Sequence, residues 1–217
     1  MTGWIALVLY LAGLGLAFGV RAATHRRHTG DSGVRLQVGP VGSASWWGKL
    51  LFVAALLAGL AGPTSHLLGL GRLALPGAPL LEVAGLILAV AGTAGLLWAQ
   101  QAMGTSWRVG VDPGEKTNLV TNGIFAIVRN PVFTAMATAS VGLFLLAPTV
   151  ASLAATILLL IALQVQVRAV EEPYLLDTHG DAYTRYTARV GRFIPGLGRT
   201  TRRPRAITQP TDGRIGS

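Results

Sequence analysis

Two long apolar runs separated by one proline constrain this chain more than any other feature. The runs cover Val132–Ala147 and Thr149–Val167, with Pro148 between them. Each is about long enough to cross a bilayer as a helix, the first at the short end of the range. Because proline cannot continue a helix, Pro148 predicts a bend. The two runs then form a hairpin whose two ends return to the same side of a membrane.

Three further apolar runs precede this hairpin, at Trp4–Val20, Leu50–Leu70 and Pro79–Ala99. A signal peptide is the alternative for the first run. It lacks the basic segment that usually precedes the apolar core, and no convincing cleavage site follows, so we expect a retained span. Pro63 is expected to kink or end the second helix. The fold class that follows is all-α, a polytopic membrane protein with about five transmembrane helices.

The third apolar run is rich in small residues, which allow helices to pack closely. These are Gly85, Ala89, Gly92 and Gly95. They would permit a homodimer, although the sequence leaves the oligomeric state open.

Composition supports a membrane protein. Of the residues, 51% are hydrophobic and only 12% are charged, against about 25% charged in soluble domains. The absence of cysteine excludes disulfides. A net charge of +9 can indicate nucleic-acid binding, but these basic residues lie beside apolar runs and form no stripe with interleaved aromatics. We therefore expect membrane lipids, and no nucleic acid, as partners.

The basic residues also predict an orientation. With five spans, 17 of the 18 lysines and arginines lie on one side and only Arg72 on the other. Because positive loops stay in the cytoplasm, we expect the N-terminus outside and both the loop 100–130 and the C-terminal segment inside.

We expect three regions: residues 1–99 as a three-span membrane part, 100–198 as the part that carries the site, and 199–217 as a basic disordered tail. Within the second, the turn signal Asp112-Pro-Gly-Glu115 predicts a short extended hairpin or irregular flap at 103–122.

The segment after the hairpin is amphipathic. Pro173 is allowed in the first turn of a helix, and Gly180 interrupts that helix. Beyond it, Tyr183, Tyr186 and Val190 share one helical face.

Charged residues stand at both feet of the hairpin. Arg129 precedes the first apolar run, and Glu171 and Glu172 follow the second. The hairpin therefore brings a cation and two carboxylates to one membrane face, and this is our site hypothesis. None of the four histidines has partners at metal-ligand spacing, so we expect no metal site.

Four blocks of sequence in this half carry a resemblance. They are Gly123-Ile-Phe125 with Arg129-Asn-Pro-Val-Phe133, then Glu171-Glu172, then Gly180-Asp-Ala-Tyr183-Thr-Arg-Tyr186, and Val190-Gly-Arg192-Phe-Ile-Pro195. Over about 104–195 the chain resembles the integral-membrane isoprenylcysteine carboxyl methyltransferase and phospholipid methyltransferase superfamily. Where that family usually has Arg-His-Pro-x-Tyr and Gly-Pro-Tyr, this chain lacks the histidine and both tyrosine hydroxyls.

The resemblance implies S-adenosylmethionine as methyl donor at the cytoplasmic end of the hairpin, and a lipophilic acceptor that reaches the site from the membrane. It assigns the catalytic positions to Arg129, Glu171 and Glu172. The expected cofactor-binding residues are Trp107, Gly123, Phe125, Val128, Asn130, Pro131, Phe133, Tyr183, Tyr186, Arg192 and Pro195.

The chemistry of these side chains suggests which group of S-adenosylmethionine each can bind. Arg129 or Arg192 can grip the donor carboxylate, either glutamate can take the ammonium or ribose hydroxyls, and the aromatic rings can stack on adenine or face the sulfonium. A carboxylate acceptor requires no base, whereas an amine or hydroxyl requires one, for which a glutamate is the candidate.

Two other interpretations remain open. One is a membrane reductase that uses a nicotinamide cofactor on a related scaffold. The other is a non-enzymatic membrane module, which would bind no cofactor. The identity of the acceptor lies beyond the sequence, because fold analogy does not fix a substrate.

Overall fold

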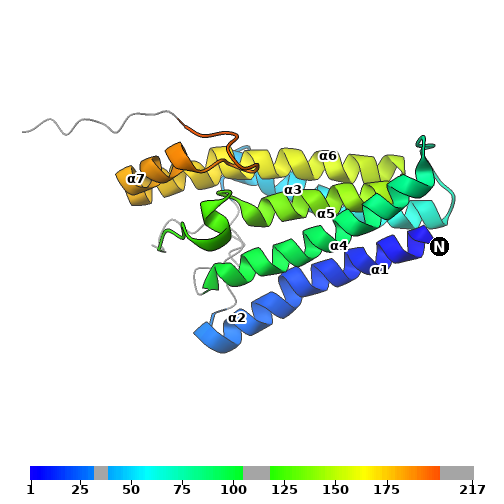
Figure 1. Cartoon of the computed structure of the whole chain (residues 1–217), viewed down its shortest axis with the longest axis horizontal. Coiled ribbons are helices and arrows are strands. Elements are labelled where there is room, and N and C mark those ends of the chain that lie inside the picture. Colours follow the sequence, from blue (N-terminus) through cyan, green and yellow to red (C-terminus); the bar gives the residue numbers. More distant parts are fainter. Residues whose placement is uncertain (32–38, 105–117, 201–217) are drawn as a thin grey trace, which may run out of the picture.

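The computed structural model describes residues 1–31, 39–104 and 118–200, and it shows an elongated bundle of helices (Figure 1). The first helix runs from Thr2 to Thr29 as α1 (Thr2–Leu14), a π-helical segment η1 (Gly15–Val20) and α2 (Arg21–Thr29). Two more long helices follow, α3 (Ala44–Leu67) and α4 (Ala78–Ala102).

The second half begins with a 3₁₀ turn, η3 (Gly123–Ala126), and the helix α5 (Pro131–Leu146). The next elements are α6 (Val150–Val165), a second π-helical segment η4 (Gln166–Glu171) and the last helix α7 (Glu172–Arg189). The described residues contain no strand, only isolated bridges. The all-α prediction is confirmed.

Four helices are long and apolar enough to cross a membrane, namely those over Thr2–Thr29, Ala44–Leu67, Ala78–Ala102 and Val150–Arg189. α5 has 16 residues, which corresponds to about 24 Å at 1.5 Å per residue. It is apolar but shorter than the four candidate spans, so a fifth span stays a prediction. The four long apolar helices are those of a polytopic membrane protein.

The bend at Pro148 is confirmed. Thr149 caps α6, since its hydroxyl accepts from the backbone N–H of Ser152 while the Ser152 hydroxyl accepts from the N–H of Thr149. Arg72 forms an isolated bridge with Thr149, so this one basic residue lies at the bend. The N-terminus lies at the same end of the bundle, and α2, η3 and α7 lie at the other (Figure 1).

Two predicted boundaries differ from the structure. The first helix continues nine residues past Val20 to Thr29. Pro63 does not end α3, which runs on to Leu67. Beside Pro63, the hydroxyl of Thr149, the N-cap residue of α6, donates to the Gly62 carbonyl at 3.3 Å.

Small residues bring α4 and α5 into backbone contact. A Cβ atom at Gly92 would lie 2.4 Å from the backbone nitrogen of Ala139, and one at Gly142 would lie 2.3 Å from that of Ala89. The small-residue face of α4 is therefore covered by α5. It is not available to a second copy of the chain, and the homodimer stays a prediction without an assigned surface.

Candidate functional site

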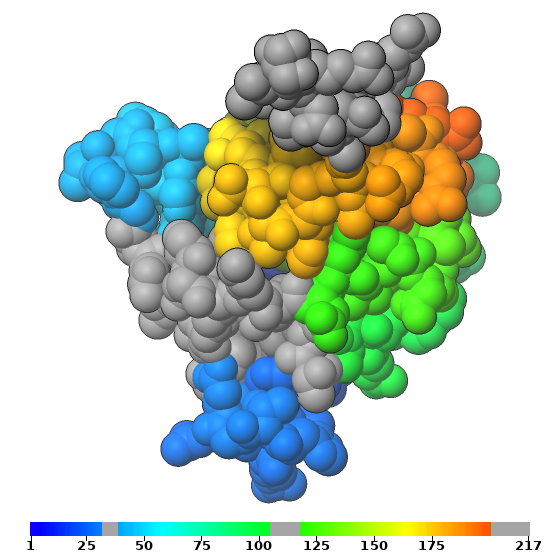
Figure 2. Space-filling model, turned by 90° about the vertical axis from the view of Figure 1, so that its left-hand side faces the viewer, coloured from blue at the N-terminus to red at the C-terminus, as the bar shows by residue number. Residues whose placement is uncertain are grey.

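The two feet of the hairpin meet in the ion pair between Arg129 and Glu172, and backbone contacts join the foot of α5 to the turn that follows α7. Val128 and Gly191 form a parallel bridge, and the Arg129 N–H donates to the Gly191 carbonyl at 2.8 Å. The backbone and side-chain amides of Asn130 both donate to the Arg192 carbonyl at 3.1 Å. In Figure 2, which faces this end of the bundle, α7 and the segment around η3 adjoin each other. The convergence predicted from the apolar pattern is confirmed.

Gly191 makes this junction possible. A Cβ atom there would lie 2.2 Å from the Ile194 carbonyl oxygen and 2.7 Å from that of Leu197, so no larger residue fits without a shift. The turn closes when the Arg192 N–H donates to the Leu197 carbonyl at 2.8 Å. Arg192 is thereby aimed back toward α7.

Glu172 lies between two guanidinium groups. Its Oε1 is 3.1 Å from Nη2 of Arg129. Arg192 binds both of its oxygens, with Nε to Oε1 at 2.7 Å and Nη2 to Oε2 at 2.8 Å. This two-point pairing is the strong form of an arginine–carboxylate contact. Glu172 therefore links the foot of α5 to the turn that follows α7.

Arg129 is buried but only partly satisfied. Its side chain is 2% exposed, and Nη2 donates to the Gly198 carbonyl at 2.9 Å. Nε and Nη1 are buried and have no hydrogen-bond partner in the part of the chain that the structure describes. Burial lowers the pKa of Arg129, and the neighbouring Glu172 acts in the opposite direction. For Arg192, the hydrogen bond to Glu172 outweighs burial and raises the pKa. Buried donors without a partner, such as Nε and Nη1 of Arg129, are rare in proteins and call for an explanation.

Glu171 has a different environment from Glu172. Its Oε1 accepts from Nε2 of Gln166 at 3.3 Å, and no ion pair with it is found among the described residues. Gln166 and Glu171 are five residues apart, the repeat of the π-helix η4 in which both lie. Pro173 gives a cause for the wider turn, because it lacks an N–H and its ring would clash with the carbonyl four residues earlier.

The residues predicted to share one face of α7 do so, and this tyrosine face is buried. Tyr183, Tyr186 and Val190 form a cluster with Leu119 and Leu175. The Gly180 backbone is non-helical, with φ 49° and ψ −121°, so the predicted interruption is confirmed. This kink turns the last part of α7 onto the segment around η3. There the Tyr186 hydroxyl donates to the Phe125 carbonyl at 2.6 Å.

Residues 81–182 match the model of the phospholipid methyltransferase family. These residues, just under half of the chain, are similar to that family. No curated protein matches the chain. Together with the apolar helices, the match supports an integral-membrane methyltransferase in general terms. The family region includes Arg129 and both glutamates, whereas α1 and α3 precede it.

Not every residue assigned from the sequence lies in the cluster around Arg129 and Glu172. Phe133 packs among Ala55, Leu159 and Leu163 in the bundle core. Gly123 is exposed at the start of η3, with φ 57°, and Pro195 is exposed in the turn after Arg192. These three contribute to the scaffold around the feet. Trp107 and residues 105–117, the central part of the flap predicted at 103–122, lie outside the described residues.

Pro131 and Phe125 have local structural roles. Pro131 is buried at the first position of α5, where its missing N–H costs nothing. Phe125 is buried in η3 and its carbonyl fixes Tyr186.

The sequence reasoning missed several contributors. Gln166 holds Glu171, the Thr134 hydroxyl donates to the Phe193 carbonyl at 2.7 Å, and Gly198 accepts from Arg129. Gln166 carried a usable signal, because a polar residue stands close to two glutamates at the end of an apolar run. The contacts with the Phe193 and Gly198 carbonyls left no signal in the sequence, because every residue has a backbone carbonyl.

Proposed function

We propose that this protein transfers a methyl group from S-adenosylmethionine to a lipophilic acceptor at the cytoplasmic face of the membrane. Two facts support the proposal: the chain contains a phospholipid methyltransferase family region, and a partly unsatisfied arginine lies at the feet of its hairpin. The basic residues favour the cytoplasm as the side of the site, because positive loops remain inside.

The proposal rests chiefly on the buried hydrogen-bond donors of Arg129 that have no partner among the described residues. Leaving a buried charged donor without a partner is costly, on the order of 1–3 kcal/mol or more. Nε and Nη1 are two such atoms in one side chain. A carboxylate satisfies guanidinium donors with strong, charge-assisted hydrogen bonds, and S-adenosylmethionine carries one. Arg192 is less suited to this contact, because Glu172 already binds its guanidinium at two points.

The remaining groups of S-adenosylmethionine, the methyl donor, have candidate binding partners near Arg129. S-adenosylmethionine supplies an activated methyl group on a sulfonium. Tyr183 and Tyr186 present two buried rings with centroids 6.2 Å apart, and such rings stack on adenine or attract a cation. Glu171 can receive an ammonium or ribose hydroxyls, since none of its described contacts is a cation.

The acceptor decides what Glu171 does in the reaction. An amine or hydroxyl acceptor must lose a proton, and Glu171 is better suited than Glu172 to receive it because arginines already bind both carboxylate oxygens of Glu172. A carboxylate acceptor needs no base. In either case the protein's main contribution is to align the nucleophile with the methyl group.

Calorimetry with S-adenosylhomocysteine on the detergent-solubilised protein tests the proposal. Loss of two charge-assisted hydrogen bonds in Arg129→Ala should weaken binding by about a hundredfold. Arg185→Ala is the matched control, since Arg185 is an exposed arginine of α7. Equal affinity in wild type and Arg129→Ala would reject the assignment of Arg129.

A thermal-shift comparison separates this function from the reductase alternative. A ligand that binds only the folded state raises its stability in proportion to the logarithm of its concentration. We expect S-adenosylhomocysteine to stabilise the protein and NADPH to have no effect. Stabilisation by NADPH alone would favour a reductase, and no shift with either ligand would favour a non-enzymatic module.

A further inference from the structure

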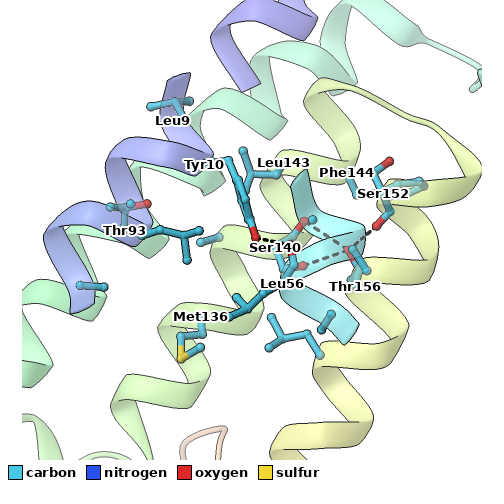
Figure 3. A pocket seen from close by; sticks show the side chains of 18 of the residues that line it. Leu9, Tyr10, Leu56, Thr93, Met136, Ser140, Leu143, Phe144, Ser152 and Thr156 are labelled. Carbon is cyan, nitrogen blue, oxygen red and sulfur yellow. Dashed lines mark hydrogen bonds between the residues drawn. The ribbon is translucent and has the colours of Figure 1, made fainter. Parts of the chain in front are cut away.

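A cavity of about 110 Å³ lies inside the bundle, between α1, α3, α5 and α6 with one edge of α4 (Figure 3). Its walls are mainly aliphatic and aromatic. On α5 it extends from Met136 to Phe144. Those residues come 5 to 13 positions after Pro131, so the cavity lies about 8 to 20 Å below the foot that carries Arg129. It is therefore within the membrane part of the protein, separate from the charged cluster.

Hydroxyl groups also line this cavity, but their donors are used within the protein. Tyr10 donates to the Leu56 carbonyl at 2.5 Å, and Thr93 donates to the Ala89 carbonyl at 2.8 Å. Thr156 contacts the Ser152 carbonyl at 3.0 Å and the Ser140 hydroxyl at 3.0 Å. Figure 3 shows the contacts around Ser140 and Thr156 as dashed lines. The cavity thus demands no polar partner and suits a hydrocarbon.

The walls come from two different parts of the sequence. α5 and α6 belong to the phospholipid methyltransferase family region, and their near ends hold Arg129 and Glu171. α1 and α3 precede that region, which begins at residue 81. They contribute Tyr10, Gly13 and Phe18 from the first helix, and Ala55 and Gly59 from α3. Half of the cavity is therefore supplied by helices that the family region does not include.

We propose that this cavity holds a short stretch of the aliphatic chain of the methyl acceptor, and that α1 and α3 set which chains fit. This inference rests on the proposed function. The hairpin connects the two places, since a molecule whose head lies at the feet of α5 and α6 extends its chain along the same two helices. An apolar cavity of about 150 Å³ accepts one benzene ring, so this smaller space holds only a short stretch of a slender chain and excludes a fused ring system.

Met136 stands at the end of the cavity nearer the site. It packs in two clusters, with Ala17 and Leu96 on one side and with Ala55 and Leu159 on the other. Methionine has three rotatable bonds and adapts its shape readily. A chain that enters from the site displaces this side chain without moving a helix.

Photolabelling tests the cavity directly. The probes are three C16 chains with a mid-chain diazirine and an amine, hydroxyl or carboxylate head. Gly13→Leu places a side chain in the cavity, and its Cβ atom would lie an ordinary 3.7 Å from the Thr93 hydroxyl oxygen. Gly15→Leu is the matched control, because Gly15 is exposed two residues later and has no atom within 4 Å of a Cβ atom. Gly13→Ala provides a milder step should Gly13→Leu not fold.

We expect the label on residues 9–18 and 136–144, reduced about tenfold by Gly13→Leu and unchanged by Gly15→Leu. Label spread over the lipid-facing surface, equal in both variants, would overturn the inference. For the head group that is methylated, Gly13→Leu should raise KM about tenfold for the C16 chain and leave KM for a C4 chain unchanged.

Two further outcomes are decisive. Label in the cavity with no change in the C16 KM, or with no methylation of any probe, would mean that a membrane lipid occupies the cavity, and the inference would be wrong. S-adenosylhomocysteine binding in Gly13→Leu separates the two proposals. Wild-type affinity there, with no cavity label, removes only the inference, whereas no binding to wild type removes the proposed function.

Discussion

Different forces hold together the body of the bundle, where α4 and α5 pack, and its site end, where Arg129, Glu172 and Arg192 meet. In the body, α4 and α5 approach until backbone meets backbone at Gly92 and Gly142, with no charge involved. At the site end, Arg129, Glu172 and Arg192 connect three segments through ion pairs and carbonyl contacts. The body has no spare hydrogen-bonding capacity in these contacts, whereas Arg129 keeps two unpartnered nitrogen atoms. A rigid apolar body thus supports an end that is electrostatically incomplete and suited to a charged ligand.

The largest effect is expected at Glu172. In Glu172→Ala, Arg129 and Arg192 lose the carboxylate between them, and breaking a buried ion pair costs about 3–5 kcal/mol. Because Arg192 keeps 15% of its side-chain surface exposed, we expect the lower end of that range. Chemical denaturation in detergent measures the loss. Glu171→Ala is the control, and an equal effect of both variants would show that the two carboxylates are not distinct.

The next effect is expected in the body. Gly92→Ala drives a methyl group against backbone atoms of α5 at 2.4 to 2.8 Å, and overpacking of this kind costs about 1–3 kcal/mol. Gly95→Ala is the matched control on the same helix, since its nearest contact is 3.6 Å from the side chain of Ala135. Both variants gain helix propensity equally. Thermal unfolding should separate them, and coincident curves would contradict the close α4–α5 contact.

A smaller effect is expected when Arg129 keeps its charge. Arg129→Lys retains a cation beside Glu172 but cannot supply the planar set of donors. We expect S-adenosylhomocysteine affinity to fall about tenfold, less than in Arg129→Ala. Arg192→Lys should affect stability more than affinity, because Glu172 already occupies that guanidinium. Calorimetry on both variants checks this order, and the reverse order would assign the donor carboxylate to Arg192.

The smallest effect is expected at Tyr186. Tyr186→Phe removes one hydrogen bond, to the Phe125 carbonyl, worth about 1 kcal/mol. Both rings of the tyrosine face remain. Hydrogen exchange at 119–128 should increase while exchange in α4 and α5 stays unchanged. Faster exchange throughout would mean that the site end and the body unfold together.

Much of the fold was predictable from the sequence because apolar length and proline act locally. The runs on either side of Pro148 predicted the hairpin, whose first and shorter arm is α5. Pro63 shows the limit, since α3 continues beyond it to Leu67. The sequence also brought Arg129 and the glutamates to one end, because both ends of a hairpin must return to the same side.

Only the tertiary structure shows which side chains of the site bind each other and which have no ionic partner among the described residues. Glu171 and Glu172 are adjacent and identical in the sequence, yet only Glu172 contacts arginines. The difference arises from a π-helical turn ahead of Pro173 and from the turn at Gly191, which returns Arg192 to α7. Phe133, which motif position assigned to the cofactor, packs in the core because the facing helices leave space for it there. Local chemistry determined which elements form, whereas partners distant in the chain decided which side chains remain free to act.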